Sequence, residues 1–307
     1  MDLQQLFRRP ILAVADNSVV ERTIRRSGGG LVRRFVAGET LDESMVQVRR
    51  LAEVDLTATL DQLGENVRTA AEATAAVASY TEILDRLAAE GLEPNISVKL
   101  TMLGLDFGDD AAYRNLLPVV ERAAAVGGFV RVDMEGSTYT ERTIAITERA
   151  HAEYPGVVGT VIQAYLHRSE ADVARLMRQD IRIRLVKGAY AEPASIAFQG
   201  KEAVDGAYRK LLEQMLGTAR YPAIATHDPA LIALTRERAE RLALPTDAYE
   251  FQLLYGVRRD EQLALRKDGY RVRVYVPYGT EWYPYFTRRI AERPANALFV
   301  VRSLVKG

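Results

Sequence analysis

Four side chains near the C-terminal end have the types and the spacing to bind a carboxylate. Tyr285, Arg288, Arg289 and Glu292 stand at i, i+3, i+4 and i+7, so a helix would place them on one face. Two adjacent guanidiniums beside a phenol and a carboxylate suit a planar anion, because arginine binds carboxylates through paired hydrogen bonds. The spacing also permits a plainer interpretation, a solvated helix face with its own Arg–Glu pairs.

A second group of polar residues stands where otherwise apolar strand patterns end. Its members are Lys99, Asp133, Gln163, Arg184, Lys187, Thr226, His227, Asp228 and Tyr275. Charges buried at such positions are costly unless they are paired or bind a ligand. If these strand ends meet at one edge, they predict a site for a sizeable polar ligand. The alternative is a set of ion pairs, such as one between Lys99 and Asp133.

A regular alternation of strand and helix patterns provides that common edge. Strands are expected at 54–60, 95–101, 129–134, 158–164, 181–186, 223–226, 249–254 and 271–276. Helices are expected near 68–90, 110–125, 138–153, 169–178, 201–219, 228–241, 258–268 and 281–292. Strict alternation requires parallel strands with right-handed crossovers. Eight such units favour an α/β (βα)₈ barrel of the TIM type, with the site at the C-terminal strand ends. A doubly wound open sheet is disfavoured, because no G-x-G-x-x-G follows the first strand.

The domain expectation is a single domain over residues 1–307. Residues 1–53 form an N-terminal helical extension, with a capping box at Ser18 and Glu21, a glycine linker at 27–30 and helices at 31–36 and 40–53. Residues 54–294 form the barrel, and residues 295–307 form a C-terminal tail.

Composition excludes several classes of function. The chain of 307 residues is 48% hydrophobic and 27% charged, with no net charge, which is typical of a soluble globular protein and gives no sign of nucleic-acid binding. It has no cysteine, so disulfides and thiolate zinc sites are impossible. No run reaches the roughly 18 apolar residues of a membrane span. A cytoplasmic protein is expected, and peripheral attachment at the inner face of the cell membrane stays open.

The remaining chemistry points to redox catalysis by a bound cofactor. A metal site is not expected, because only three histidines are present and none stands in a ligand pattern. Lys99 or Lys187 could form a Schiff base, but neighbouring arginines do not supply a base. Asp133 and Glu135 match a glycosidase pair only weakly. A cationic mouth without an evident acid or base fits cofactor chemistry better.

Eight motifs taken together resemble the proline dehydrogenase family, in its monofunctional bacterial form. They are DQLGE (61–65), SVKLT (97–101), RVDME (131–135), RLVKGAY (184–190), ATHD (225–228), EFQLLYG (250–256), VYVPYG (274–279) and YFTRRIAERP (285–294). The resemblance implies a barrel that holds FAD noncovalently at its mouth. It also implies FAD-dependent oxidation of L-proline to Δ1-pyrroline-5-carboxylate, the first step of proline catabolism. Hydride would pass from proline to flavin N5, and electrons would pass on to a membrane quinone.

The resemblance also assigns roles to individual residues. Substrate binding falls to Lys99, Leu254, Tyr275, Tyr285, Arg288 and Arg289, with Glu65 as a gate on Arg288 and Glu292 as a brace. Arg184 would stand at flavin N5, with Asp133 beside it. The rest of the flavin site would comprise Met134, Gln163, Val186, Lys187, Gly188, Ala189, Tyr190, Thr226, His227 and Gln252.

Partners and competing functions follow from the same residues. The product would pass to a separate pyrroline-5-carboxylate dehydrogenase, and no nucleic acid is expected. The alternatives are another flavin barrel oxidoreductase, such as a methylenetetrahydrofolate reductase, a Schiff-base lyase using Lys99, and a barrel without catalytic activity.

Overall fold

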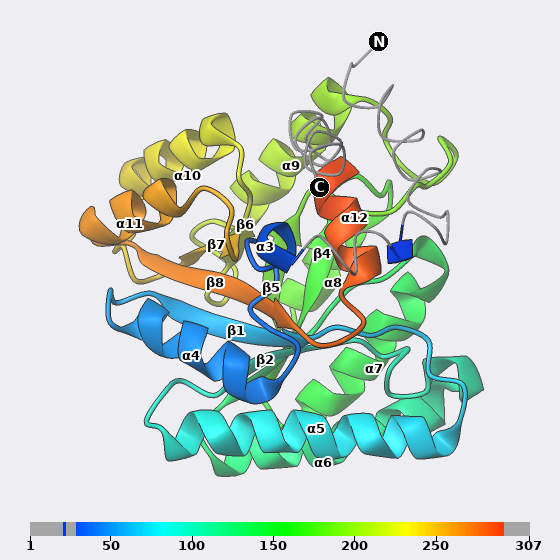
Figure 1. Ribbon diagram of the computed structural model, residues 1–307. Helices are drawn as coiled ribbons and strands as arrows, with labels where there is room; N and C mark the ends of the chain where they lie inside the picture. The colour runs from blue at the N-terminus through cyan, green and yellow to red at the C-terminus, as the bar shows by residue number, and fades with distance from the viewer. Residues whose placement is uncertain (1–20, 23–28, 292–307) are drawn as a thin grey trace.

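The computed structural model describes residues 21–22 and 29–291, and its centre is a closed barrel of eight parallel strands (Figure 1). The strands are β1 Thr57–Gln62, β2 Asn95–Val98, β3 Phe129–Val132, β4 Val158–Gln163, β5 Arg182–Val186, β6 Ala223–Ala225, β7 Glu250–Leu254 and β8 Arg271–Tyr278. Each strand pairs in parallel with the next, and β8 closes the barrel against β1 with Leu60 opposite Val276. The predicted (βα)₈ barrel is confirmed.

Helices cover the outside of this barrel. They are α3 Gly29–Val32, α4 Leu41–Ala52, α5 Ala70–Ala89, α6 Asp109–Ala125, α7 Thr140–Glu153, α8 Ser169–Met177, α9 Lys201–Met215, α10 Pro229–Arg241, α11 Arg259–Lys267 and α12 Tyr283–Ala291, with short 3₁₀ turns at Leu105–Phe107 and Ser137–Tyr139. In Figure 1, α5 and α6 run side by side under one flank, while α3 and α12 lie near each other at the opposite side.

Local sequence explains where the helices begin. At α5 the Thr69 hydroxyl accepts a hydrogen bond from the Glu72 amide at 3.2 Å, and apolar residues recur along the buried face of the helix. At α4, Thr40 and Glu43 form a reciprocal capping box that the sequence analysis did not identify. The expected capping box at Ser18 and Glu21 lies outside the described residues, because Ser18 is not among them.

Several expected boundaries are wrong. β1 begins at Thr57 rather than 54, because residues 53–55 form a turn in which Asp55 has φ 57°. β2 ends at Val98, and residues 100–104 form a turn, so Lys99 lies between the strand and this turn. β8 continues to Tyr278, which places Tyr275 inside the strand rather than at its end.

The N-terminal extension also differs from its expectation. Residues 29–32 are helical, so half of the expected linker belongs to α3, and residues 33–35 form a turn where a helix was expected. This segment packs on α12 through a cluster of Phe35, Trp282, Tyr283 and Phe286. The Ala37 amide donates to the Pro277 carbonyl at 2.9 Å, which fixes the segment to the end of β8. The segment after α3 therefore supports α12, the helix that carries Arg288 and Arg289.

Candidate active site

Arg184 on β5 is the central cation of the barrel mouth. It is 4% exposed, and its Nη1 lies 2.7 Å from Asp133 Oδ1 at the end of β3. Its Nε donates to Gln252 Oε1 at 2.5 Å, and the Ser97 hydroxyl lies 3.2 Å from both of its terminal nitrogens. Residues from three other strands therefore fix the guanidinium in one orientation.

Tyr275 on β8 connects to the same carboxylate. Its hydroxyl donates to Asp133 Oδ2 at 2.8 Å, and the Arg184 guanidinium carbon lies 5.3 Å from the centre of its ring. Burial, together with the carboxylates of Asp133 and Asp61, raises the pKa of Tyr275 well above its ordinary value. The phenol stays protonated and keeps its ring against the guanidinium.

Lys99 is paired with Asp61 rather than with Asp133. Lys99 Nζ lies 2.7 Å from Asp61 Oδ1, and the two side chains are 7% and 1% exposed as residues. Burial opposes a charge on Lys99, but the carboxylates of Asp61 and Asp133 outweigh that effect and raise its pKa above the ordinary value. The suggested Lys99–Asp133 ion pair is wrong as a direct contact, because Asp133 serves Arg184.

Gln163, at the end of β4, connects two neighbouring loops. Its side-chain nitrogen donates to the Glu135 carbonyl at 2.9 Å, and its oxygen accepts from the Ala189 amide at 3.1 Å. The Glu135 carboxylate in turn accepts from the Thr101 amide at 3.2 Å and the Thr101 hydroxyl at 2.6 Å. Burial raises the pKa of Glu135. These contacts hold the loops after β2, β3, β4 and β5 together around one side of the mouth.

Lys187, just beyond β5, bridges two carboxylates. Its Nζ lies 2.5 Å from Asp205 Oδ1 on α9 and 2.8 Å from Asp228 Oδ2. Burial would raise the pKa of Asp228, but the hydrogen bond and charge of Lys187, the Ala230 amide and the charge of Lys201 together lower it to about 2. Asp228 also caps α10 by accepting from the Ala230 amide at 3.1 Å. The Lys187 ammonium is thus held at the rim of the mouth by Asp228, which caps α10, and by Asp205 of α9.

His227 and Leu254 lie together on the other side of the mouth. The Leu254 amide donates to His227 Nε2 at 2.9 Å, so this nitrogen is unprotonated. Arg258 donates to the His227 carbonyl at 2.8 Å. The histidine is held in a fixed orientation by the backbone of β7.

The helix α12 brings its cations to the mouth. Arg288 Nη2 lies 2.9 Å from Glu65 Oε1, in the loop after β1, and both side chains are about a quarter exposed, at 25% and 28%. The Arg289 guanidinium carbon lies 5.3 Å from the centre of the Tyr285 ring, one turn earlier. Burial opposes the charge on Arg288, but Glu65, Tyr190 and Tyr275 raise its pKa. Tyr275 of the mouth packs against the cluster that contains Tyr285 and Phe286 of α12, so this helix lies over the mouth.

Gly188 is required by the backbone and by a neighbouring ring. Its φ is +133°, and an added Cβ would lie 2.3 Å from Cδ1 of Tyr165. The glycine therefore fixes the loop after β5 against Tyr165, in addition to any room it leaves for a ligand.

The remaining predicted site residues also belong to these strand ends and loops. Met134 and Thr226 are buried, and Val186, Ala189 and Tyr190 are half-buried. Burial first, then Glu65 and Glu135, raises the pKa of Tyr190. Glu292 lies outside the described residues, so its expected bracing role has no structural counterpart here.

Sequence reasoning missed some members of the site. Asp61, Ser97 and Asp205 hold Lys99, Arg184 and Lys187, but none was chosen as a site residue. Asp61 and Ser97 stand within two of the motifs, and they are direct neighbours in the register of β1 and β2. The signal that could have identified Asp61 and Ser97 is that each is a polar residue within an otherwise apolar strand pattern. Asp205 lies in mid-helix and gave no signal of this kind.

A closed parallel barrel whose cations, amides and phenols meet at the C-terminal strand ends defines a barrel enzyme that acts on a polar substrate. The model of the proline dehydrogenase family matches residues 44–302. The chain is 40% identical to a proline dehydrogenase of Deinococcus radiodurans, over 99% of this chain and 100% of that protein. It is 38% identical to proline dehydrogenase 1 of Bacillus subtilis, over 98% and 100% of the two chains. The chain belongs to the proline dehydrogenase family, in its monofunctional form, and is an oxidoreductase of proline catabolism.

A solved structure of a bifunctional relative has the same fold. Proline utilization A of Bdellovibrio bacteriovorus, inactivated by N-propargylglycine, superimposes with a TM-score of 0.81 at 26% identity, over 93% of this chain and 36% of that one. The bifunctional protein PutA of Escherichia coli is 30% identical over 92% of this chain and 26% of its own length. This chain therefore corresponds to about a quarter to a third of those larger proteins.

Within residues 21–22 and 29–291, none of the helices combines the length and the apolar character that a membrane span requires.

Proposed function

We propose that the mouth binds FAD noncovalently and L-proline together, and that the enzyme oxidises proline to Δ1-pyrroline-5-carboxylate. The observation that carries this proposal is the position of α12. Its Arg288 is paired with Glu65 after β1, and its apolar side chains pack against Tyr275. A substrate carboxylate needs cations at a partly dry mouth, and α12 supplies them next to the fixed Arg184.

The donor set at the mouth fits a flavin. Arg184 and Lys187 supply fixed cations, Gln163 and Gln252 supply amides, and Thr226 supplies a buried hydroxyl. Met134, Val186, Gly188, Ala189, Tyr190 and His227 would complete the surroundings. When bound, the flavin would take a hydride from the carbon beside the proline nitrogen at its N5 atom. A guanidinium held as Arg184 is held, with Asp133 and Ser97, would stabilise negative charge that develops in the ring.

The substrate would be oriented by its carboxylate. Arg288 and Arg289 would bind it from α12, and Lys99, kept protonated by Asp61, would bind it from the end of β2. Tyr275, Tyr285 and Leu254 would pack around the ring and exclude water. Glu65 would close over the substrate through its ion pair with Arg288, and Glu292 would brace the arginine pair. Oxidation removes a hydride from the ring carbon and a proton from the ring nitrogen.

The wider pathway follows from this reaction. Electrons would pass on to a membrane quinone, which requires at least transient contact with the inner face of the cell membrane from the cytoplasm. The pyrroline product would pass to a pyrroline-5-carboxylate dehydrogenase carried on another chain.

The protonated state of Lys99 argues against a Schiff-base lyase. A lysine forms an imine only from its neutral amine, and the pKa of Lys99 is raised rather than lowered. Borohydride with a carbonyl substrate should therefore not trap Lys99.

An anaerobic spectroscopic experiment tests the proposed function. Purified protein should carry the yellow flavin absorbance, or gain it from added FAD, and should lose it on addition of L-proline without oxygen. A protein that binds no FAD, or a bound flavin that dithionite reduces but L-proline does not, would contradict the proposal.

A further inference from the structure

A second polar pocket lies at the floor of the barrel, at the N-terminal ends of the strands. It has a volume of about 350 Å³, and its charged lining consists of Arg182, Arg220, Arg271, Arg273, Glu93 and Asp247. Arg182 is the first residue of β5 and Arg271 is the first residue of β8, so the pocket opens at the end of the barrel opposite to the mouth. It shares none of these residues with the site proposed for flavin and proline.

The arginines of this floor pocket differ in their partners. Arg273 is paired with Glu250 at 3.0 Å and Glu93 at 2.8 Å, and Arg220 is paired with Asp180 at 2.8 Å. Arg182 and Arg271 form no ion pair with any residue that the structure describes. The paired carboxylates thus serve Arg273 and Arg220, and the guanidiniums of Arg182 and Arg271 are the two in the lining that no described carboxylate pairs with.

Arg182 is held by aromatic rings instead of carboxylates. Its guanidinium carbon lies 4.2 Å from the centre of the Phe129 ring and 4.6 Å from that of Tyr221. Its Nε is buried and has no hydrogen-bond partner among the described residues. Burial lowers the pKa of Arg182, an effect that nearby Glu250 does not cancel. The stacked rings fix the fork of donors without neutralising it.

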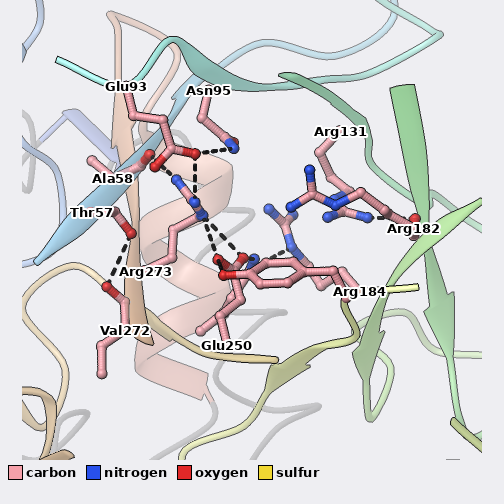
Figure 2. A network of polar contacts seen from close by, with 12 residues as sticks. Thr57, Ala58, Glu93, Asn95, Arg131, Arg182, Arg184, Glu250, Val272 and Arg273 are labelled. Carbon is pink, nitrogen blue, oxygen red and sulfur yellow. Dashed lines mark hydrogen bonds and ion pairs between the residues drawn. The ribbon is translucent and has the colours of Figure 1, made fainter. Parts of the chain in front are cut away.

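Arg131 lies next to Arg182 and adds a further guanidinium without an ion pair among the described residues. It is 2% exposed, and among the described residues it donates only to the backbone carbonyls of Thr160, at 3.1 Å, and Arg182, at 2.7 Å. Its guanidinium carbon lies 4.7 Å from the centre of the same Phe129 ring. In Figure 2 the Arg131 and Arg182 side chains lie next to each other, apart from the Arg273 network. Two neighbouring guanidiniums that form no ion pair are costly to bury, and a bound anion would offset that cost.

The sequence makes room for this arrangement. A Cβ on Gly159 would lie 2.9 Å from the Phe129 ring, 3.0 Å from Arg131 Nη1 and 2.3 Å from the Arg182 carbonyl. Any larger residue in this position of β4 would displace the cluster. The close packing of Arg131 and Arg182 therefore depends on a glycine at position 159 of β4.

We propose that the floor pocket binds a small oxyanion of the phosphate class. Arg182 and Arg271 would bind its oxygens through paired hydrogen bonds, which the planar guanidinium fork favours. Glu93 and Asp247 in the same lining exclude an extended polyanion, because it would meet both carboxylates. A free phosphate and a small phosphomonoester present the same oxygens, so the experiment must separate them.

Calorimetry with the flavin-loaded protein tests the proposal. Inorganic phosphate is titrated at constant ionic strength adjusted with sodium chloride, and glycerol 3-phosphate is titrated in the same way. We expect one saturable site per chain, and the tighter of the two ligands identifies the source. Arg182→Gln and Arg271→Gln should each weaken binding by about tenfold or more, as expected for the loss of a charge-assisted hydrogen bond.

Two further variants keep this experiment decisive. Arg271 is exposed, so Arg271→Gln retains the fold even if Arg182→Gln does not. Arg122→Gln is the matched control, because Arg122 is an exposed arginine paired with Asp85 on the outer helices. It should bind phosphate as the parent does. The absence of a saturable heat with both ligands, or equal binding by Arg271→Gln and the parent, would overturn the proposal.

Discussion

The two ends of the barrel hold buried arginines in different ways. At the mouth, Arg184 shares one carboxylate, Asp133, with the phenol of Tyr275, and its other contacts are neutral. Toward the floor, Arg273 is enclosed by the carboxylates of Glu250 and Glu93 and by the Ala58 carbonyl, as Figure 2 shows. The charge of Arg273 is satisfied within the protein, whereas the charge of Arg184 is only partly compensated.

This difference separates stability from function. A fully paired buried cation contributes to the folded state mainly because breaking the pair is costly. A cation with one shared carboxylate can still stabilise charge on a ligand. Gln252 connects the two ends, because it accepts from Arg184 and donates to Glu250. The orientation of Arg184 at the mouth thus depends, through Gln252, on the ion pair between Glu250 and Arg273 toward the floor.

The largest expected effect on stability comes from breaking the ion pair between Arg273 and Glu250. Arg273→Leu would leave Glu250, 1% exposed, without its cation, and should reduce the free energy of unfolding by about 3–5 kcal/mol. Urea denaturation measures the change. Arg271→Leu, two residues earlier and exposed, should stay within about 0.5 kcal/mol of the parent. An equal loss of unfolding free energy in both variants would show that the ion pairs of Arg273 do not make it more important for stability than Arg271.

The opposite pattern is expected on α12. Arg288→Met should lower kcat/KM for L-proline by the equivalent of about 2–5 kcal/mol, because a charge partner of the substrate is lost. Its free energy of unfolding should change by no more than about 1 kcal/mol, since the Glu65 pair is partly exposed. Steady-state kinetics and urea denaturation give both values, with Arg122→Met as the control. An unchanged kcat/KM would place Arg288 outside the substrate site.

Acid titration sharpens the role of Glu250. Burial would raise its pKa, but Arg273 dominates and lowers it from 4.5 to about 2. A depressed carboxyl pKa stabilises the folded state above the unfolded value, and this contribution, about 3 kcal/mol, is lost as the pH falls from about 4.5 to about 2. Glu250→Gln should therefore lose less stability than the parent between pH 5 and pH 3. Parallel acid profiles would show that the pair does not control acid unfolding.

Lys99 allows stability and binding to be separated at the mouth. Lys99→Met alone leaves Asp61 buried without its cation and should destabilise the fold. The double variant Lys99→Met/Asp61→Asn removes both charges and should recover most of that stability. Both variants should bind a carboxylate inhibitor more weakly by about 1.5–3 kcal/mol. Recovery of inhibitor binding in the double variant would mean that Lys99 does not contact the carboxylate.

The smallest effect is expected at the gate. Glu65→Gln removes an ion pair whose members are 28% and 25% exposed, so unfolding should change by about 1 kcal/mol or less. The KM for L-proline should change only a few-fold. A tenfold change in KM would give Glu65 a larger part in substrate binding than its exposure indicates.

The barrel was predictable because its signals are local. The alternation of strand and helix patterns follows from apolar periodicity, and eight units of this kind close into a barrel. The polar residues at the strand ends therefore meet at one mouth, where Arg184 contacts Asp133 and Gln163 contacts Ala189.

The pairing partners were less predictable, because they depend on the register of the closed barrel. Lys99 meets Asp61 since β1 and β2 align Asp61 with Ser97, two residues before Lys99. In β8, Val272 and Val274 alternate with Arg271 and Arg273, a pattern that resembles a strand with one solvated face. In the barrel both faces are covered, so Arg273 is 3% exposed and needs Glu250.

The carboxylate clamp on α12 can be tested by comparing two substrates in one measurement. L-Proline and L-prolinamide share the ring and its oxidisable carbon, but the amide lacks the negative charge. Anaerobic flavin reduction is followed as a function of the concentration of each. We predict half-maximal reduction by L-prolinamide at a concentration at least about thirtyfold higher than for L-proline, as expected for the loss of a buried charge partner. Equal concentration dependence for both compounds would contradict the assignment of Arg288 and Arg289 to the substrate carboxylate.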